Sequence, residues 1–72
     1  PVQAWIAPRS SQLGPRVAEI EGVRRFCDAE AVRAVFREDR YGEHRWPLLF
    51  FAVWWGIHMD RLEPAEALGR LA

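Results

Sequence analysis

The chain has 72 residues, of which 50% are hydrophobic, and its ten basic and ten acidic residues give a formal net charge of zero. A chain of this length allows one domain at most, and it is too apolar for a disordered segment. The balanced charge argues against a nucleic-acid or anionic-membrane partner, because both favour a basic surplus.

Composition also limits the chemistry. A domain this small is marginally stable without a staple, yet the single Cys27 cannot form an internal disulfide and no Cys and His group has zinc-finger spacing. All ten basic residues are Arg, which excludes a lysine Schiff base. One unpaired cysteine fits a reducing compartment, so we expect a cytoplasmic protein. A first residue of Pro rather than Met suggests an excised or processed piece.

The chain opens with a short predicted helix over residues 1–7, anchored by Trp5 and Ile6. Pro8 is expected to interrupt it, because proline lacks an amide proton and disfavours helix in the preceding residue. Residues 9–14 are expected to form a polar connection, in which Ser10 or Ser11 could cap a turn.

The first main helix is predicted over residues 15–25, after the breaker pair Gly14–Pro15. Three apolar residues recur there every third position, as they do along one face of a helix. Gly22 weakens this helix by about 1 kcal/mol relative to alanine. The recurring residues are Val17, Ile20 and Val23.

The second main helix is predicted over residues 29–40. Asp28 is a suitable N-cap, because its carboxylate can accept an orphan amide proton of the first turn. An apolar stripe that includes Val32 and Phe36 faces inward, with arginines and Glu38 facing water. Gly42 is expected to supply the left-handed residue that often ends a helix.

The third main helix is predicted over residues 46–60, and it is the element on which the others should pack. From Trp46 to Ile57 there is no charged side chain. Such a run spans roughly 18 Å as a helix, which is short of the roughly 30 Å of a bilayer core, so we expect no membrane span. Because the helix is apolar on all sides, it should be flanked on more than one face, and Gly56 permits close approach.

A short final helix is predicted over residues 65–72 after the break at Glu63–Pro64, with a frayed end. No segment shows sustained strand alternation. The predicted fold is therefore all-α: a single unit over residues 1–72, with three main helices in a small bundle and short helices at both ends.

Candidate reactive groups do not assemble into a catalytic constellation. His44 and His58 flank the apolar run, and a metal site would need both together with a carboxylate such as Asp60. Cys27 precedes a helix start that could lower its pKa, but thiol catalysis needs a base and no histidine is near in sequence. A small packed cysteine is the simpler reading.

The remaining polar pairs read as solvated helix faces. The carboxylate pairs lie among arginines, no glycine-rich phosphate loop is present, and Arg24–Arg25 is too small for a nucleic-acid patch. The aromatic run from Trp46 to Trp55 is more typical of core or interface than of a ligand box. We therefore predict no catalytic, cofactor-binding or metal-binding residue. The pairs are Glu19/Glu21, Glu38/Asp39 and Glu63/Glu66.

Three stretches resemble, in order and separation, the C-terminal end of glutamine-hydrolysing asparagine synthetases and their amidotransferase relatives. They are PVQAWI, FCDAEAVRAVF and RWPLLFFAVWWGIHMD. The family has a Pro-x-x-x-Trp helix, a Phe-Asp-x-x-x-Val helix start and a tryptophan-bearing closing helix. The matching residues are Pro1 and Trp5; Phe26 or Cys27 with Asp28 and Val32; and Trp46, Leu48, Leu49 and Trp54. The chain departs from the family at Pro47 and Ala52, where a helix former and Glu are usual.

The resemblance implies the helical C-terminal portion of an ATP-dependent ligase that activates a carboxylate as an acyl-adenylate. ATP and Mg²⁺ would belong to the parent enzyme, because the pyrophosphate loop and the basic residue near the reacting centre lie upstream of Pro1 in the family. The expected partner is the remainder of the synthetase domain. The alternative hypothesis is a stand-alone interaction module that self-associates through the Trp46–Ile57 helix.

Overall fold

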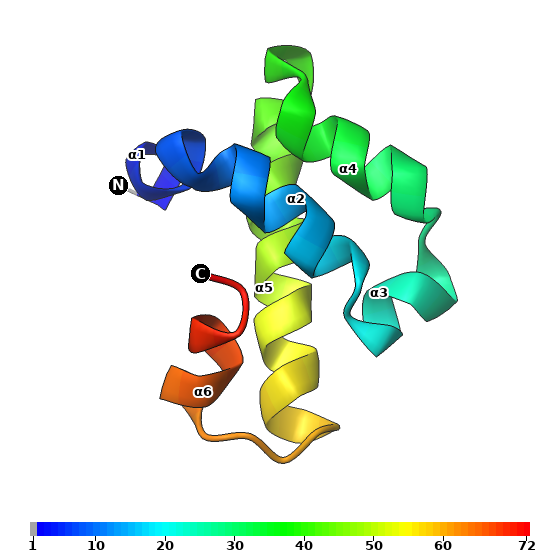
Figure 1. The fold of residues 1–72 in the computed structure, drawn as a ribbon, viewed down its shortest axis with the longest axis vertical. Coiled ribbons are helices and arrows are strands. Elements are labelled where there is room, and N and C mark those ends of the chain that lie inside the picture. Colours follow the sequence, from blue (N-terminus) through cyan, green and yellow to red (C-terminus); the bar gives the residue numbers. More distant parts are fainter. Residues whose placement is uncertain (1) are drawn as a thin grey trace.

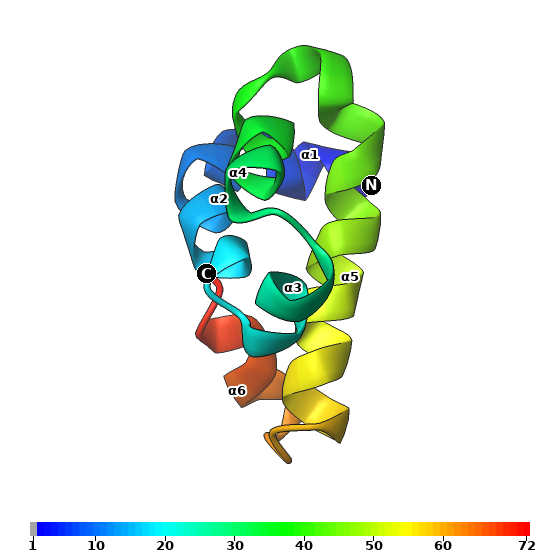
Figure 2. The same cartoon turned by 90° about the vertical axis from the view of Figure 1, so that its right-hand side faces the viewer.

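Every other element of the chain lies on one side of a single long helix, α5 (Gly42–His58), as Figures 1 and 2 show from two directions. The computed structural model describes residues 2–72, so the expectations that concern Pro1 lie outside the described residues. In chain order the other elements are α1 (Val2–Ile6), η1 (Ala7–Arg9), α2 (Ser10–Ala18), α3 (Glu21–Phe26), α4 (Ala29–Arg37), η2 (Asp39–Tyr41) and α6 (Pro64–Gly69).

The all-α prediction is confirmed, with three main helices, α2, α4 and α5, of 9, 9 and 17 residues. The bounds of the first were wrong. Instead of one helix over 15–25, α2 ends at Ala18 and α3 follows an extended Ile20, with φ −65° and ψ 131°. This break lets Ile20 and the apolar residues of both helices reach the core.

The expected polar connection over residues 9–14 is also wrong, because α2 begins at Ser10 and includes Gly14 and Pro15. A Cβ built on Gly14 would lie 3.0 Å from the Cβ of Phe36, so the bare glycine allows α2 to press against α4. This contact favours helix where the local sequence signals a break. Ser10 does not act as an N-cap; its hydroxyl donates to the Ile6 carbonyl.

Helix α4 begins as predicted, since the Ala31 amide donates to the Asp28 carboxylate at 2.9 Å. It ends at Arg37 rather than 40. The Arg45 guanidinium donates to the carbonyls of Val35 and Glu38, and so satisfies the end of the helix at that point. Gly42 is not a left-handed cap; with φ −53° it is the first residue of α5.

Helix α5 starts four residues before the predicted 46 and ends two before the predicted 60, so Pro47 lies inside it rather than in its first turn. Its buried face comprises Arg45, Leu49, Ala52, Trp55 and Gly56. The predicted close approach at Gly56 is confirmed, because a Cβ there would lie 3.0 Å from the Cβ of Ala67 in α6.

The C-terminal segment is docked and not frayed, contrary to expectation. A reciprocal capping box between Glu63 and Glu66 starts α6, and both Ala67 and Leu71 are fully buried. The Arg16 guanidinium donates to the carbonyl of Leu71 and to that of Ala72. Burial and these hydrogen bonds together offset the entropy that would otherwise loosen a chain end.

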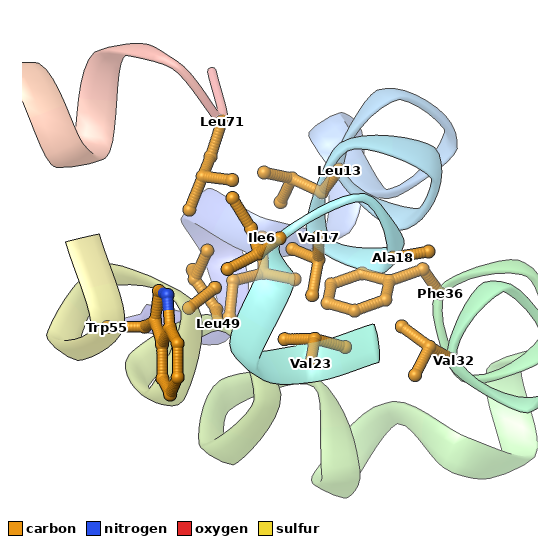
Figure 3. Close-up of a cluster of buried hydrophobic side chains, with 12 residues drawn as sticks. Ile6, Leu13, Val17, Ala18, Val23, Val32, Phe36, Leu49, Trp55 and Leu71 are labelled. Carbon is orange, nitrogen blue, oxygen red and sulfur yellow. The ribbon is translucent and has the colours of Figure 1, made fainter. Parts of the chain in front are cut away.

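The core is built from side chains of α1 through α5 together with Leu71 (Figure 3). Trp55 is its largest member, and it fits because α3 presents Gly22: a Cβ on that residue would lie 2.2 Å from the Trp55 ring. The Trp55 indole N–H has no hydrogen-bond acceptor within the described chain. The other labelled core residues are Ile6, Leu13, Val17, Ala18, Val23, Val32, Phe36 and Leu49.

Candidate functional site

The two histidines, His44 and His58, lie near opposite ends of α5. Fourteen residues separate them, which corresponds to roughly 21 Å along a helix. His58 packs on Trp54 with ring centroids 5.0 Å apart, while His44 neighbours Tyr41. Among residues 2–72, no three His, Cys, Asp or Glu side chains are grouped to hold a metal ion. The structure therefore does not bring His44, His58 and Asp60 together as ligands.

Cys27 is half-buried and lines an apolar cavity of about 450 Å³ with Phe26, Pro47, Leu48 and Phe51. No lining side chain can act as a base toward the thiol. The neighbouring Asp28 carboxylate caps α4. The surroundings of Cys27 are those of a packing residue, as the sequence indicated.

Most members of the three carboxylate pairs serve local structure. Glu21 pairs with Arg25 one turn away, at 3.7 Å. Glu38 contacts two arginines near the end of α4, and Glu63 with Glu66 forms the capping box of α6. None of these carboxylates is buried, so none has the apolar surroundings that would prepare it for acid–base chemistry.

The outer face of α5 carries a row of exposed aromatic side chains, Trp46, Phe50 and Trp54, which we call the aromatic ridge. Their exposed fractions are 41%, 55% and 40%. The spacing of four residues places them one above another on the helix, and the Trp46 and Phe50 rings meet edge to face at 5.6 Å. Helices α1, α3, α4 and α6 pack against other parts of α5, as the expected flanking on more than one face requires, but nothing in the described chain covers this outer face.

The ridge is large for a small protein. An aromatic side chain has about 150–250 Å² of surface, so the three exposed fractions leave on the order of 300 Å² of aromatic area. Phe26, 74% exposed and in edge contact with the half-buried Phe51, adds to the apolar surface nearby. The largest apolar patch on a monomeric protein is typically about 300–600 Å² and often has a function, so the ridge is a candidate interaction site.

A second feature, not predicted from the sequence, is a cleft between the η1–α2 segment and α4, which we call the arginine cleft. It has a volume of about 450 Å³ and is lined by three arginines: Arg33 and Arg37 from α4, and Arg45 from α5. Only one acidic residue, Asp39, shares the lining. The spacing of Arg33 and Arg37 was a visible signal of a shared helix face, but nothing local placed Arg45 beside them.

Arg45 is 6% exposed and joins three elements. Its guanidinium donates to the Val35 carbonyl at 2.9 Å, to the Ser10 hydroxyl at 3.1 Å and to the Glu38 carbonyl at 3.1 Å. The Asp39 carboxylate lies 3.7 Å away and is fully exposed. The hydrogen-bonding groups of Arg45 are therefore largely satisfied by neutral acceptors, but its charge is not.

Comparison of the chain with family models, with curated proteins and with solved structures gives no match. Over residues 2–72, no helix combines the length and the apolarity that crossing a bilayer requires. The two features that the structure offers for function are thus the aromatic ridge and the arginine cleft.

Proposed function

We propose that this chain is the helical C-terminal portion of an asparagine-synthetase-like, ATP-dependent amidotransferase, and that it supports the synthetase half without catalytic residues of its own. The observation that carries the proposal is the aromatic ridge, an uncovered apolar face on the longest helix. In this arrangement the remainder of the synthetase domain covers the ridge.

The positions of the motif residues support the proposal. The family motif that marks a helix start falls at the start of α4, where Asp28 caps the helix and Val32 is buried. Trp5 of the first motif lies on α1, half-buried against the core. The closing motif falls on α5, with Leu49 inward and Trp46 and Trp54 outward.

The proposed role is mechanical. Burying about 300 Å² of aromatic surface supplies on the order of 7 kcal/mol before the costs of ordering the partner surfaces. That energy would hold the helical portion against the part of the enzyme that binds ATP and Mg²⁺. The proposed setting is cytoplasmic, with no nucleic-acid or membrane partner.

The test is to express the chain together with the segment encoded directly before it. We expect a Ser-Gly-Gly-x-Asp-Ser loop in that segment, ATP–pyrophosphate exchange by the longer protein, and none by residues 1–72 alone. Phe50→Glu should lower the melting temperature of the longer protein by several degrees, because it buries a charge at the new interface. Leu68→Glu, at an exposed position on α6, is the matched control. An upstream segment without the loop would contradict the proposal.

The second candidate function is self-association through α5, and the charge pattern around the ridge favours it. Glu43 precedes the ridge and Arg61 follows it, and both are exposed. An antiparallel pair of α5 helices centred on Phe50 would place Glu43 of each copy opposite Ile57 of the other, about one turn before the loop that carries Arg61. Two-fold interfaces of this kind are self-complementary.

Light scattering on the purified 72-residue chain tests this candidate. A discrete dimer that melts cooperatively, and that Phe50→Glu converts to a monomer while Leu68→Glu does not, would support self-association. A monomeric or aggregating chain would argue against it and leave the enzyme fragment as the function.

A further inference from the structure

The side chains that line the arginine cleft carry more positive than negative charge. Burying a cation is costly unless an anion or a strong hydrogen-bond network compensates. The three close acceptors of Arg45 are neutral, and its nearest carboxylate, Asp39, is 3.7 Å away in open solvent, where an ion pair contributes little. A buried guanidinium in this condition is suited to an additional anion.

Two further arginines face the same cavity. The Arg33 side chain makes no hydrogen bond or ion pair with any residue in the described range 2–72, so its guanidinium is available. The Arg37 guanidinium forms ion pairs with Glu30 at 3.3 Å and Glu38 at 3.7 Å. Both pairs are exposed and therefore weak, so an anion that binds Arg37 more strongly can displace the two carboxylates. The lining thus has three positive charges and one negative charge.

The cavity can also hold more than a bare ion. Its volume of about 450 Å³ lies in the range of small-molecule sites, roughly 300–1,000 Å³. Pro8, Pro15 and Phe36 contribute apolar wall beside the arginines, and Ser11 contributes a hydroxyl. The site therefore combines a cationic end with an apolar side, which is the composition expected for a ligand that has an anionic head and an apolar body.

We propose that the arginine cleft binds a small phosphate monoester, with its phosphate between Arg33, Arg37 and Arg45 and its organic part against the proline and phenylalanine wall. A phosphate has about −1.5 to −2 charge at neutral pH and three acceptor oxygens, which matches the lining better than a carboxylate with one charge. Guanidinium groups bind phosphate through paired hydrogen bonds. The cleft lies between α2 and α4, so this proposal is independent of what covers the aromatic ridge on α5.

The experiment is a titration of the 72-residue chain at constant ionic strength, followed by amide NMR shifts. The probes are phenyl phosphate, inorganic phosphate, benzoate and phenol. We expect saturable binding of phenyl phosphate with the largest shifts near Ser11 and Gly14. Inorganic phosphate and benzoate should bind more weakly, and phenol should not bind.

Three variants sharpen the test. Arg33→Gln should weaken phenyl phosphate binding about tenfold, the effect of losing one charge-assisted hydrogen bond. Arg24→Gln, which removes the same charge from an exposed position on α3 outside the cleft, should change binding less than twofold. Asp39→Asn should strengthen binding several-fold, because it removes the only carboxylate in the lining.

These variants leave the hydrogen bonds of Arg45 in place, so each is expected to fold. Absence of saturation would overturn the proposal, as would equal weakening by Arg33→Gln and Arg24→Gln, which would indicate diffuse attraction only. Benzoate binding as tight as phenyl phosphate would overturn the assignment of phosphate as the head group.

Discussion

The inner and outer faces of α5 are both apolar, yet only the inner face is packed by the rest of the chain. Side-chain size accounts for part of the difference. The inner face includes Ala52 and Gly56, and α6 approaches it closely at Ala67. The outer face presents Trp46, Phe50 and Trp54, whose rings stay exposed and offer broad contact surface. Small residues thus mark where a neighbouring helix comes closest to α5, while Trp55 is the one aromatic of this helix that the fold buries, because Gly22 of α3 makes room for its ring.

Substitutions of the adjacent residues Leu49 and Phe50 should show the largest difference in stability between the two faces. Leu49 is 2% exposed, so Leu49→Ala should lower the free energy of unfolding by about 3 kcal/mol through lost burial and a cavity. Phe50→Ala, on the outer face, should cost less than about 1 kcal/mol in the monomeric chain. Urea denaturation of both variants measures the gap. Equal losses would mean that the outer face is packed in solution.

The fit of Trp55 against α3 gives the next largest effect. Gly22→Ala would place a methyl group 2.2 Å from the Trp55 ring, and we expect a net loss of about 2 kcal/mol despite the better helix propensity of alanine. Gly69→Ala is the control, since a Cβ there would meet nothing within 4 Å. Thermal unfolding of the two variants should differ by several degrees. A neutral Gly22→Ala would show that α3 can move away freely.

Arg45 is the one charged residue of the inner face. Arg45→Met keeps much of the apolar stem but removes three hydrogen bonds, including the one to the Val35 carbonyl at the end of α4; the Glu38 carbonyl keeps the Tyr41 amide as a donor. We expect a loss of about 1.5 kcal/mol by urea denaturation, with amide exchange accelerated at the end of α4. An unchanged stability would imply that water replaces the guanidinium.

The smallest effect concerns the Asp60–Arg70 pair, which links the end of α5 to α6 at 2.8 Å. Both side chains are about one-third exposed, so Asp60→Asn should cost only about 0.5 kcal/mol, and less at high salt. Unfolding measured at low and high salt separates this charge effect from the packing at Ala67. A loss that salt does not reduce would assign the effect to the loop and not to the ion pair.

The sequence predicted correctly those elements whose formation depends on neighbouring residues in the chain. The all-α class, the Asp28 cap and the apolar run of α5 follow from composition, capping preference and charge pattern. The start of α2 could not be predicted, because Gly14–Pro15 looks like a break until Phe36 of α4 lies against it. The docked C-terminus depends on Arg16, more than fifty residues away in sequence.

The arginine cleft could likewise be predicted only in part from the sequence. Arg33 and Arg37 share a helix face that periodicity can reveal, but Ser10 and Arg45 reach the cleft from α2 and α5 through tertiary packing alone. The outer aromatic residues were visible in the sequence. Which of them would stay exposed depended on where α3 and α6 pack.

The chain reversal after α5 requires an unusual backbone. Arg61 has φ 61°, the left-handed region that residues with a Cβ adopt at a cost of roughly 1 kcal/mol. Glycine at this position would relieve that strain, although it would also add conformational freedom to the unfolded chain. Where the relief of strain is the larger effect, the single substitution Arg61→Gly gives a more thermostable protein. The loop between α5 and α6 is accordingly where directed evolution for heat tolerance should begin.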